Sequence, residues 1–175
     1  MRRQLRPLVP FSLALAILAS VSVLRARPAA AAGDTLITFT ALLNGAQQSP
    51  PVASPSTGVA LVLYDKTASI ICWRISFTPL MAPEILAHFH GPGAPGVNAP
   101  ILINISPSPS PFGSPKHGCA PVSKDDAKSL SKGLLYINVH STTAPNGEIR
   151  GQVLPTNVKY KVDTTPASPS GAFLN

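Results

Sequence analysis

The sequence has few charged residues and lacks the short motifs that mark the common enzyme folds. Only 12% of its 175 residues are charged, whereas 20 are proline. This balance is typical of an extracytoplasmic β-domain with long loops rather than of a helical enzyme. No Gly-x-Ser-x-Gly or phosphate-binding loop motif occurs, and the Gly-x-Gly-x-x-Gly spacing at residues 91–96 lacks the following helix of a nucleotide site, so nothing indicates an activated hydroxyl or a nucleotide site. We therefore assign no catalytic residues and expect a protein that is not an enzyme.

Residues 1–32 have the order of a secretory signal peptide. A basic start precedes an apolar run over residues 8–24, and small residues ending at Ala32 supply a cleavage site. The alternative is an uncleaved anchor, because the apolar run reaches about the lower length limit for crossing a bilayer. Cleavage is favoured because small residues follow the run. We expect a secreted, periplasmic or cell-envelope protein that meets the membrane only if the leader is retained.

The excess of positive charge belongs mostly to this leader. The whole chain has 14 Lys and Arg against 7 Asp and Glu, but five of the arginines lie within residues 1–32. The remainder keeps 9 basic and 7 acidic residues, a formal charge of +2. The sequence therefore gives no reason to expect a nucleic-acid partner.

Only two cysteines are present, Cys72 and Cys119, and no Cys-x-x-Cys spacing occurs. In an exported protein an even number of cysteines is typical of a disulfide. Two independent thiols, or two thiolate ligands of a metal, are the alternatives. A disulfide would tie the strand that carries Trp73 to the chain beyond the proline-rich residues 106–114.

Short runs of alternating apolar residues predict β-strands, and proline, glycine and asparagine separate them. Ser123, with acidic residues after it and Gly133 at the end, predicts one short helix. The residues expected at the centre of the core are Ile71, Trp73, Ile75 and Phe77. The predicted strands are 35–43, 58–64, 69–78, 85–90, 100–105, 134–140 and 148–153, the last two joined around residues 144–147, with a further edge strand at 158–162.

About seven strands with one short helix and proline-rich loops predict an all-β fold. We expect an antiparallel β-sandwich or small Greek-key barrel, immunoglobulin-like in architecture. Residues 33–155 would form this single domain, and residues 156–175 a loose C-terminal tail. The proline-rich residues 106–114 are expected to form an exposed loop, with His117 solvated just beyond it.

Three of the four histidines lie on predicted strands. His88 and His90 are separated by one residue and therefore share one face of a strand. His140 lies at the end of the later predicted strand 134–140, and it shares one face of that strand with Tyr136 and Asn138. Three imidazoles on the strands of one small domain form either a buried polar network or a metal site.

Both arrangements are open at this stage, and the sequence favours the network. In the network, imidazoles and neighbouring polar groups satisfy one another and fix the strand register. Its other members would be Tyr136, Asn138, Glu148 and Arg150. In the alternative the histidines bind copper or zinc, because imidazole is a common transition-metal ligand and His-x-His presents two from one surface. The ligands would be His88, His90 and His140.

Four segments in order resemble the motifs of the CHRD domain family. Residues 39–52, FTALLNGAQQSPPV, look like its opening motif, and residues 87–92, AHFHGP, resemble its central Ala-His-Ile-His-Gly-Pro. Residues 133–141, GLLYINVHS, and residues 147–152, GEIRGQ, are similar to its closing motifs. This resemblance implies a β-rich extracellular module.

The resemblance carries little chemistry with it. Gln48 stands where the family often has Glu, so no role for a carboxylate there is carried over. We expect an exported, non-enzymatic binding or structural module of the cell envelope or extracellular space, with an extracytoplasmic protein or surface ligand as its partner. The alternative is a metal-binding β-sandwich protein with copper or zinc on three histidines, redox-active in its copper form.

The leader makes a direct prediction about the mature protein. N-terminal sequencing of protein collected outside the cytoplasm should begin near Gly33, because cleavage is expected after Ala32. Full-length protein retained in the membrane with Met1 intact would show that residues 1–32 are an anchor.

Overall fold

The computed structural model describes residues 36–156, which form eight antiparallel strands and one α-helix. The predicted strand at 158–162 and the leader lie outside the described residues. Within the described part, no helix is long and apolar enough to cross a membrane. The elements are β1 (Leu36–Asn44), the short 3-10 helix η1 (Gly45–Gln47), β2 (Thr57–Asp65), β3 (Ile70–Phe77), β4 (Glu84–His90), β5 (Ile101–Ser106), β6 (Lys116–Pro121), α1 (Lys124–Ser131), β7 (Leu135–Ser141) and β8 (Ala144–Pro155).

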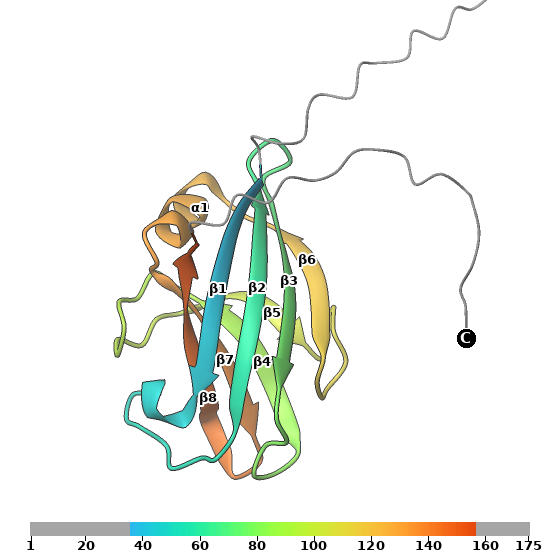
Figure 1. Ribbon diagram of the computed structural model, residues 1–175, viewed down its shortest axis with the longest axis vertical. Coiled ribbons are helices and arrows are strands. Elements are labelled where there is room, and N and C mark those ends of the chain that lie inside the picture. The colour runs from blue at the N-terminus through green and yellow to red at the C-terminus, as the bar shows by residue number, and fades with distance from the viewer. Residues whose placement is uncertain (1–35, 157–175) are drawn as a thin grey trace, which may run out of the picture. The chain divides into compact units, whose positions relative to one another are not determined.

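All eight strands belong to one sheet, in the order β5-β4-β7-β8-β1-β2-β3-β6. The sheet curls so that β1, β2 and β3 lie on the near side of Figure 1 and β4, β5 and β7 on the far side. Its two edge strands, β5 and β6, come into contact, which nearly closes a barrel. The predicted all-β class is therefore confirmed, with eight strands instead of about seven.

The core lies inside this curled sheet, where alternation along the strands places the apolar residues. Ile71, Trp73 and Ile75 of β3 are buried there as expected, whereas Phe77 is only partly buried. Trp73 packs edge-on against Phe89 of β4, with ring centroids 5.3 Å apart. This aromatic pair joins the near and far sides of the sheet through the centre of the core.

The strand that sequence reasoning missed is β6, which we expected to be part of a loop. It pairs with β3 in antiparallel register, with Cys119 opposite Cys72. The two cysteines form a disulfide across this pair. Periodicity could not find β6, because Lys116, His117 and Gly118 interrupt any apolar alternation. His117 consequently lies on a strand, although its side chain is exposed as predicted.

A buried ion pair holds the proline-rich loop against the barrel. Lys116 Nζ lies 2.7 Å from Glu84 Oε1, and both side chains are at most 3% exposed. The same ammonium donates to the carbonyl of Pro111, and Glu84 accepts from the main-chain nitrogen of Gly113. The positive and negative charges therefore neutralise each other between β4, β6 and the loop.

The connection between β7 and β8 is tighter than predicted. Ser141 pairs with Ala144, so the turn is at residues 142–143 rather than 144–147. Residues 145–147 instead form an irregularity in β8, because the register shifts between Val139 and Ser141. Pro145 contributes to this irregularity because proline has no N–H to donate to a sheet ladder. Gly147 contributes through a φ of 123°, a backbone conformation that favours glycine. A bulge of this kind turns main-chain carbonyls away from the ladder.

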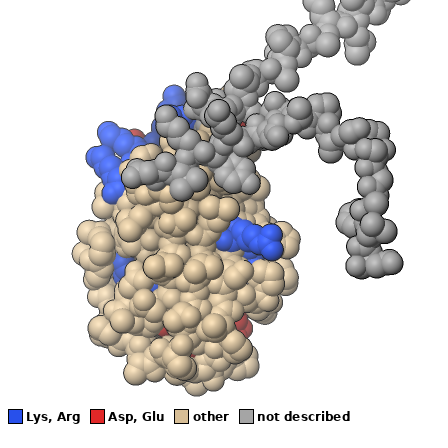
Figure 2. All heavy atoms as spheres, in the orientation of Figure 1, with Lys and Arg blue, Asp and Glu red and all other residues tan. Residues whose placement is uncertain are grey.

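The helix agrees with its sequence signature. Ser123 caps α1 by accepting a hydrogen bond from the main chain of Asp126, and Gly133 follows the helix with a φ of 70°. In Figure 1, α1 lies at the end of the barrel where β1 begins. Figure 2 shows a face of the molecule on which charged side chains are few, in keeping with the composition.

Candidate functional site

The strands β4, β7 and β8 are buried on both faces, and only one of these faces is apolar. All seven residues of β7 are buried. Its residues Leu135, Ile137 and Val139 face the apolar core. The intervening residues lie on the opposite face of the sheet, where alternation also places the polar residues of β4 and β8. The members of this buried polar layer are His88, His90, Tyr136, Asn138, His140, Glu148, Arg150 and Gln152.

The Gly-Pro loop of residues 91–100 covers the polar layer, and the layer itself holds the loop in place. Gln152 donates from Nε2 to the carbonyl of Gly93, at 2.9 Å. Arg150 donates to the carbonyl of Val97, also at 2.9 Å. The Tyr136 hydroxyl accepts from the main-chain nitrogen of Ala99, at 3.0 Å. Because the loop carbonyls take the place of water, the strands can bury this second, polar face.

The three strand histidines lie together within this layer. His88, His90 and His140 are 4%, 8% and 7% exposed. One candidate ligand nitrogen from each lies within 4.8 Å of the other two. His88 Nδ1 and His140 Nε2 are 3.4 Å apart. The strand register explains this closeness, because His140 lies opposite Leu86, two residues from His88 on the same face of β4.

Main-chain carbonyls determine which ring nitrogen carries the hydrogen in two of these histidines. His90 Nδ1 lies 2.9 Å from the carbonyl oxygen of Ala99, and His140 Nδ1 lies 2.9 Å from that of Pro145. A carbonyl oxygen only accepts hydrogen bonds, so each Nδ1 must be the donor. In the neutral rings the two Nε2 atoms therefore carry lone pairs.

The 3.4 Å separation between His88 Nδ1 and His140 Nε2 is long for a hydrogen bond. Bonds that involve ring nitrogens are usually about 3.0 Å or shorter. Two nitrogens on a tetrahedral zinc, each about 2.0–2.1 Å from the metal, are about 3.3 Å apart. The separation is therefore compatible with a long hydrogen bond and with an edge of a coordination tetrahedron, and the three candidate ligand atoms lie within 4.8 Å of one another.

All three imidazoles are held in the neutral form. Burial lowers the pKa of His88 from 6.5 to about 4, with further lowering by His140 and His90. Burial is also the main cause of the lowered pKa of His90 and of His140, although their carbonyl partners act in the opposite direction. Metal ions bind the neutral ring, so these shifts keep the lone pairs available near neutral pH.

Arg150 extends the cluster through a stack of planar groups. The rings of His90 and Tyr136 are parallel to within 1°, with centroids 4.9 Å apart. The guanidinium carbon of Arg150 lies 3.5 Å from the centroid of the Tyr136 ring. This stack places a positive charge one ring away from His90, and the charge contributes to the lowered pKa of that histidine.

Asn138 and Glu148, two more predicted members of the polar network, lie in the same buried polar layer but form hydrogen bonds with residues other than the histidines. Asn138 accepts from Gln48 Nε2 at 2.7 Å and donates to the Asn146 carbonyl. Glu148 accepts from Ser54, Ser56 and the main chain of Met81. These hydrogen bonds, together with one from Ser141, outweigh the effect of burial and lower the pKa of Glu148.

Glu148 and Arg150 do not pair with each other, although they lie two residues apart on one strand. Lys116 with Glu84 forms the only ion pair between side chains of residues 36–156. The structure thus brings together His88, His90 and His140, with Tyr136 and Arg150 behind them, and holds Glu148 in a separate set of hydrogen bonds.

Sequence reasoning missed the residues that complete the site. Gln48 and Gln152 are buried and hold Asn138 and the Gly-Pro loop, and both belong to the quoted motifs. The carbonyls of Ala99 and Pro145 orient the rings of His90 and His140. Carbonyl oxygens have no signature in a sequence, because every residue has one.

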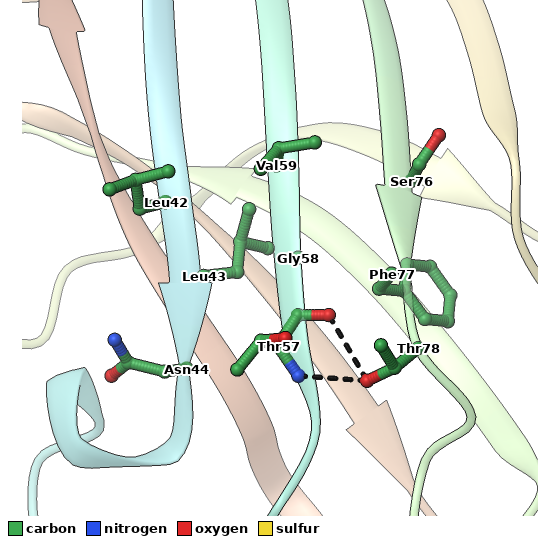
Figure 3. A pocket seen from close by; sticks show the side chains of 9 residues that line it. All are labelled: Leu42, Leu43, Asn44, Thr57, Gly58, Val59, Ser76, Phe77 and Thr78. Carbon is green, nitrogen blue, oxygen red and sulfur yellow. Dashed lines mark hydrogen bonds between the residues drawn. The ribbon is translucent and has the colours of Figure 1, made fainter.

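A hollow on the described surface lies away from the histidines. It has a volume of about 550 Å³, lies over the ends of β1, β2 and β3, and is mostly apolar. Figure 3 shows Leu42, Val59 and Phe77 around it, with Thr57 and Thr78 hydrogen-bonded to each other at one end. No titratable side chain lines it, so it offers no chemistry comparable to that of the histidine pocket.

Comparison with known families agrees with the motifs and the architecture. The model of the CHRD domain matches residues 39–153, which is most of the described barrel. The chain belongs to the CHRD domain family. Searches of curated proteins and of solved structures found no match.

The buried neutral histidines predict how stability depends on pH. The unfolded chain takes up protons on its histidines as the pH falls through 6.5, whereas folded His88 does so only near 4. The contribution of neutral His88 to the free energy of unfolding should therefore be complete above pH 6.5 and decrease as the pH falls toward 4. Urea unfolding between pH 7.5 and 4.5 measures this slope.

A matched pair of variants tests the assignment. His88→Gln should flatten the slope, and His117→Gln, which alters an exposed histidine, should leave it as in the parent protein. An unchanged slope in the His88→Gln protein would show that His88 is not the group responsible.

Proposed function

We propose that this CHRD domain is an exported, non-enzymatic binding module of the cell envelope or extracellular space. The leader-like order of residues 1–32 supports export. The bond between Cys72 and Cys119 supports it as well, because disulfides persist mainly in oxidising compartments. The buried cluster of His88, His90 and His140 beside the Gly-Pro loop is the site at which we propose that a ligand binds.

The hydroxyl closest in sequence to the pocket supports a role without catalysis. Ser141 is fully buried. Its Oγ lies 3.3 Å from Thr143 Oγ1 and accepts from the main chain of Ala144. An activated serine needs a hydrogen bond to a base such as His140, and these contacts direct the hydroxyl elsewhere.

We propose that the ligand of the pocket is a transition-metal ion, copper or zinc. One observation carries this proposal: three neutral imidazoles converge, and backbone carbonyls orient two of them so that Nε2 carries the lone pair. A second-shell acceptor on the far nitrogen of a ligating histidine is characteristic of metal sites, since it fixes the ring and its tautomer. His90 and His140 both have such an acceptor.

A hydrogen-bond network accounts for these histidines less completely. His90 and His140 use their only ring N–H on main-chain carbonyls, so the one hydrogen bond open between the three rings is from His88 Nδ1 to His140 Nε2, which are 3.4 Å apart. His90 Nε2 is buried without a hydrogen-bond partner among residues 36–156. A buried polar atom without a partner costs about 1–3 kcal/mol. Coordination to a metal would use that lone pair.

Titration of the metal-free protein with zinc(II) and copper(II) tests this function. The parent protein should bind one ion with an affinity on the order of micromolar or tighter, and His90→Ala should lose most of that affinity because one of three ligands is gone. His117→Ala is the matched control, since His117 is exposed and lies on β6. It should bind as the parent does.

Two results would contradict the metal proposal. One is the absence of binding of zinc(II), copper(II) and univalent copper alike by the parent protein, and the other is equal binding by the parent and His90→Ala. The histidines would then be structural. In that case His90→Ala should lower the free energy of unfolding by about 1–3 kcal/mol, because it removes the hydrogen-bond partner of a buried carbonyl.

A further inference from the structure

Arg150 introduces a buried positive charge that no acidic group neutralises locally. The residue is 1% exposed. Its guanidinium donates to the carbonyls of Val97 and Ala94 and to the side-chain oxygen of Asn98. All three acceptors are uncharged. The guanidinium keeps its proton in proteins, so the charge is permanent.

This charge lies directly behind the proposed metal ligands. Tyr136 is stacked between the guanidinium and the His90 ring, at 3.5 Å from the guanidinium carbon and 4.9 Å from the imidazole centroid. No acidic side chain among residues 36–156 forms an ion pair with Arg150. Glu148 is held by Ser54, Ser56 and the main chain of Met81, and Glu84 is paired with Lys116.

The donor set itself adds no negative charge. The three groups that converge are neutral imidazoles, and no carboxylate or thiolate belongs to the cluster. Most protein sites for divalent ions reduce the charge with an anionic ligand or a metal-bound hydroxide. Here a divalent ion would bring the pocket and Arg150 to a charge of +3, and a univalent ion to +2.

We infer that the pocket selects univalent copper over divalent copper and zinc, and that the buried charge of Arg150 sets this preference. The inference rests on the proposed metal-binding function and specifies its ligand. In a poorly solvated pocket the repulsion between fixed charges is weakly screened, and it is twice as large for a divalent ion. Univalent copper also accepts three nitrogen ligands without a fourth, which suits three histidines that are each less than 9% exposed.

The first experiment compares the ions in the parent protein. Univalent copper is supplied anaerobically with ascorbate and measured by competition with a chromophoric chelator. Ascorbate is used because a thiol reductant could open the disulfide between Cys72 and Cys119 and create new copper ligands. Zinc(II) and copper(II) are measured by competition at the same pH. The parent should bind univalent copper most tightly of the three.

The second experiment changes the charge behind the pocket. Arg150→Met removes it, and Arg74→Met removes an exposed arginine of β3 as a control. Because Coulomb energy scales with the product of the charges, the factor by which Arg150→Met raises the affinity for zinc(II) should be the square of the factor for univalent copper, for example about ninefold against about threefold. Arg74→Met should retain the affinity ratio of the parent.

A purely structural role for Arg150 gives a different pattern. Loss of its bonds to the Gly-Pro loop would weaken both ions and would not shift the ratio toward zinc(II). That pattern would overturn the inference. If Arg150→Met does not fold, the parent measurement decides, since equal or tighter binding of a divalent ion contradicts the inference. Absence of binding by any of the three ions would instead reject the proposed metal function itself.

Discussion

The rest of the structure depends on the burial of β4, β7 and β8 on both faces. An apolar core on one face is the ordinary condition of a β-sheet. The other face carries histidine, asparagine, arginine, glutamine and glutamate, and each buried polar group needs a partner. The Gly-Pro loop, the bulge in β8 and the segment after β1 supply these partners. They lie against the sheet because the polar residues hold them there.

The same requirement explains why the acidic groups and the histidines are kept apart. One carboxylate oxygen of Glu148 accepts from hydroxyls and a main-chain N–H, and Glu84 is paired with Lys116. Neither carboxylate belongs to the cluster of His88, His90 and His140, and burial lowers the pKa of His140 although the charge of Glu84 acts in the opposite direction. The cluster therefore consists of uncharged donors, with the permanent charge of Arg150 behind them. Its chemistry is that of imidazole lone pairs in a poorly hydrated space, which suits metal binding better than acid–base catalysis.

Local patterns were sufficient to predict which residues share a face, and therefore most of the site. Alternation placed His88 with His90 and Tyr136 with His140, and the strand register then brought these pairs together. The helix was predictable for a similar reason, since its cap and stop are local signals. The strand β6 was not, because it pairs with β3 through backbone bonds and a disulfide rather than through an apolar pattern.

Long-range features of the site were also beyond the reach of sequence patterns. The bulge at residues 145–147 has the composition of a turn, and only the pairing of Ser141 with Ala144 shows that it lies within a strand. The carbonyls of Ala99 and Pro145, which orient His90 and His140, have no sequence signature. The stack of His90, Tyr136 and Arg150 joins three strand positions whose side-chain orientations depend on the covering loop.

The central claim is that neutral imidazoles present converging lone pairs, and the tautomers of the histidines test it most directly. A long-range proton–nitrogen NMR spectrum of the metal-free protein at pH 7 assigns the protonated nitrogen of each ring. The account predicts that His90 and His140 carry hydrogen on Nδ1 alone, with both Nε2 atoms bare. A hydrogen on Nε2 of either residue, or a doubly protonated ring, would contradict it.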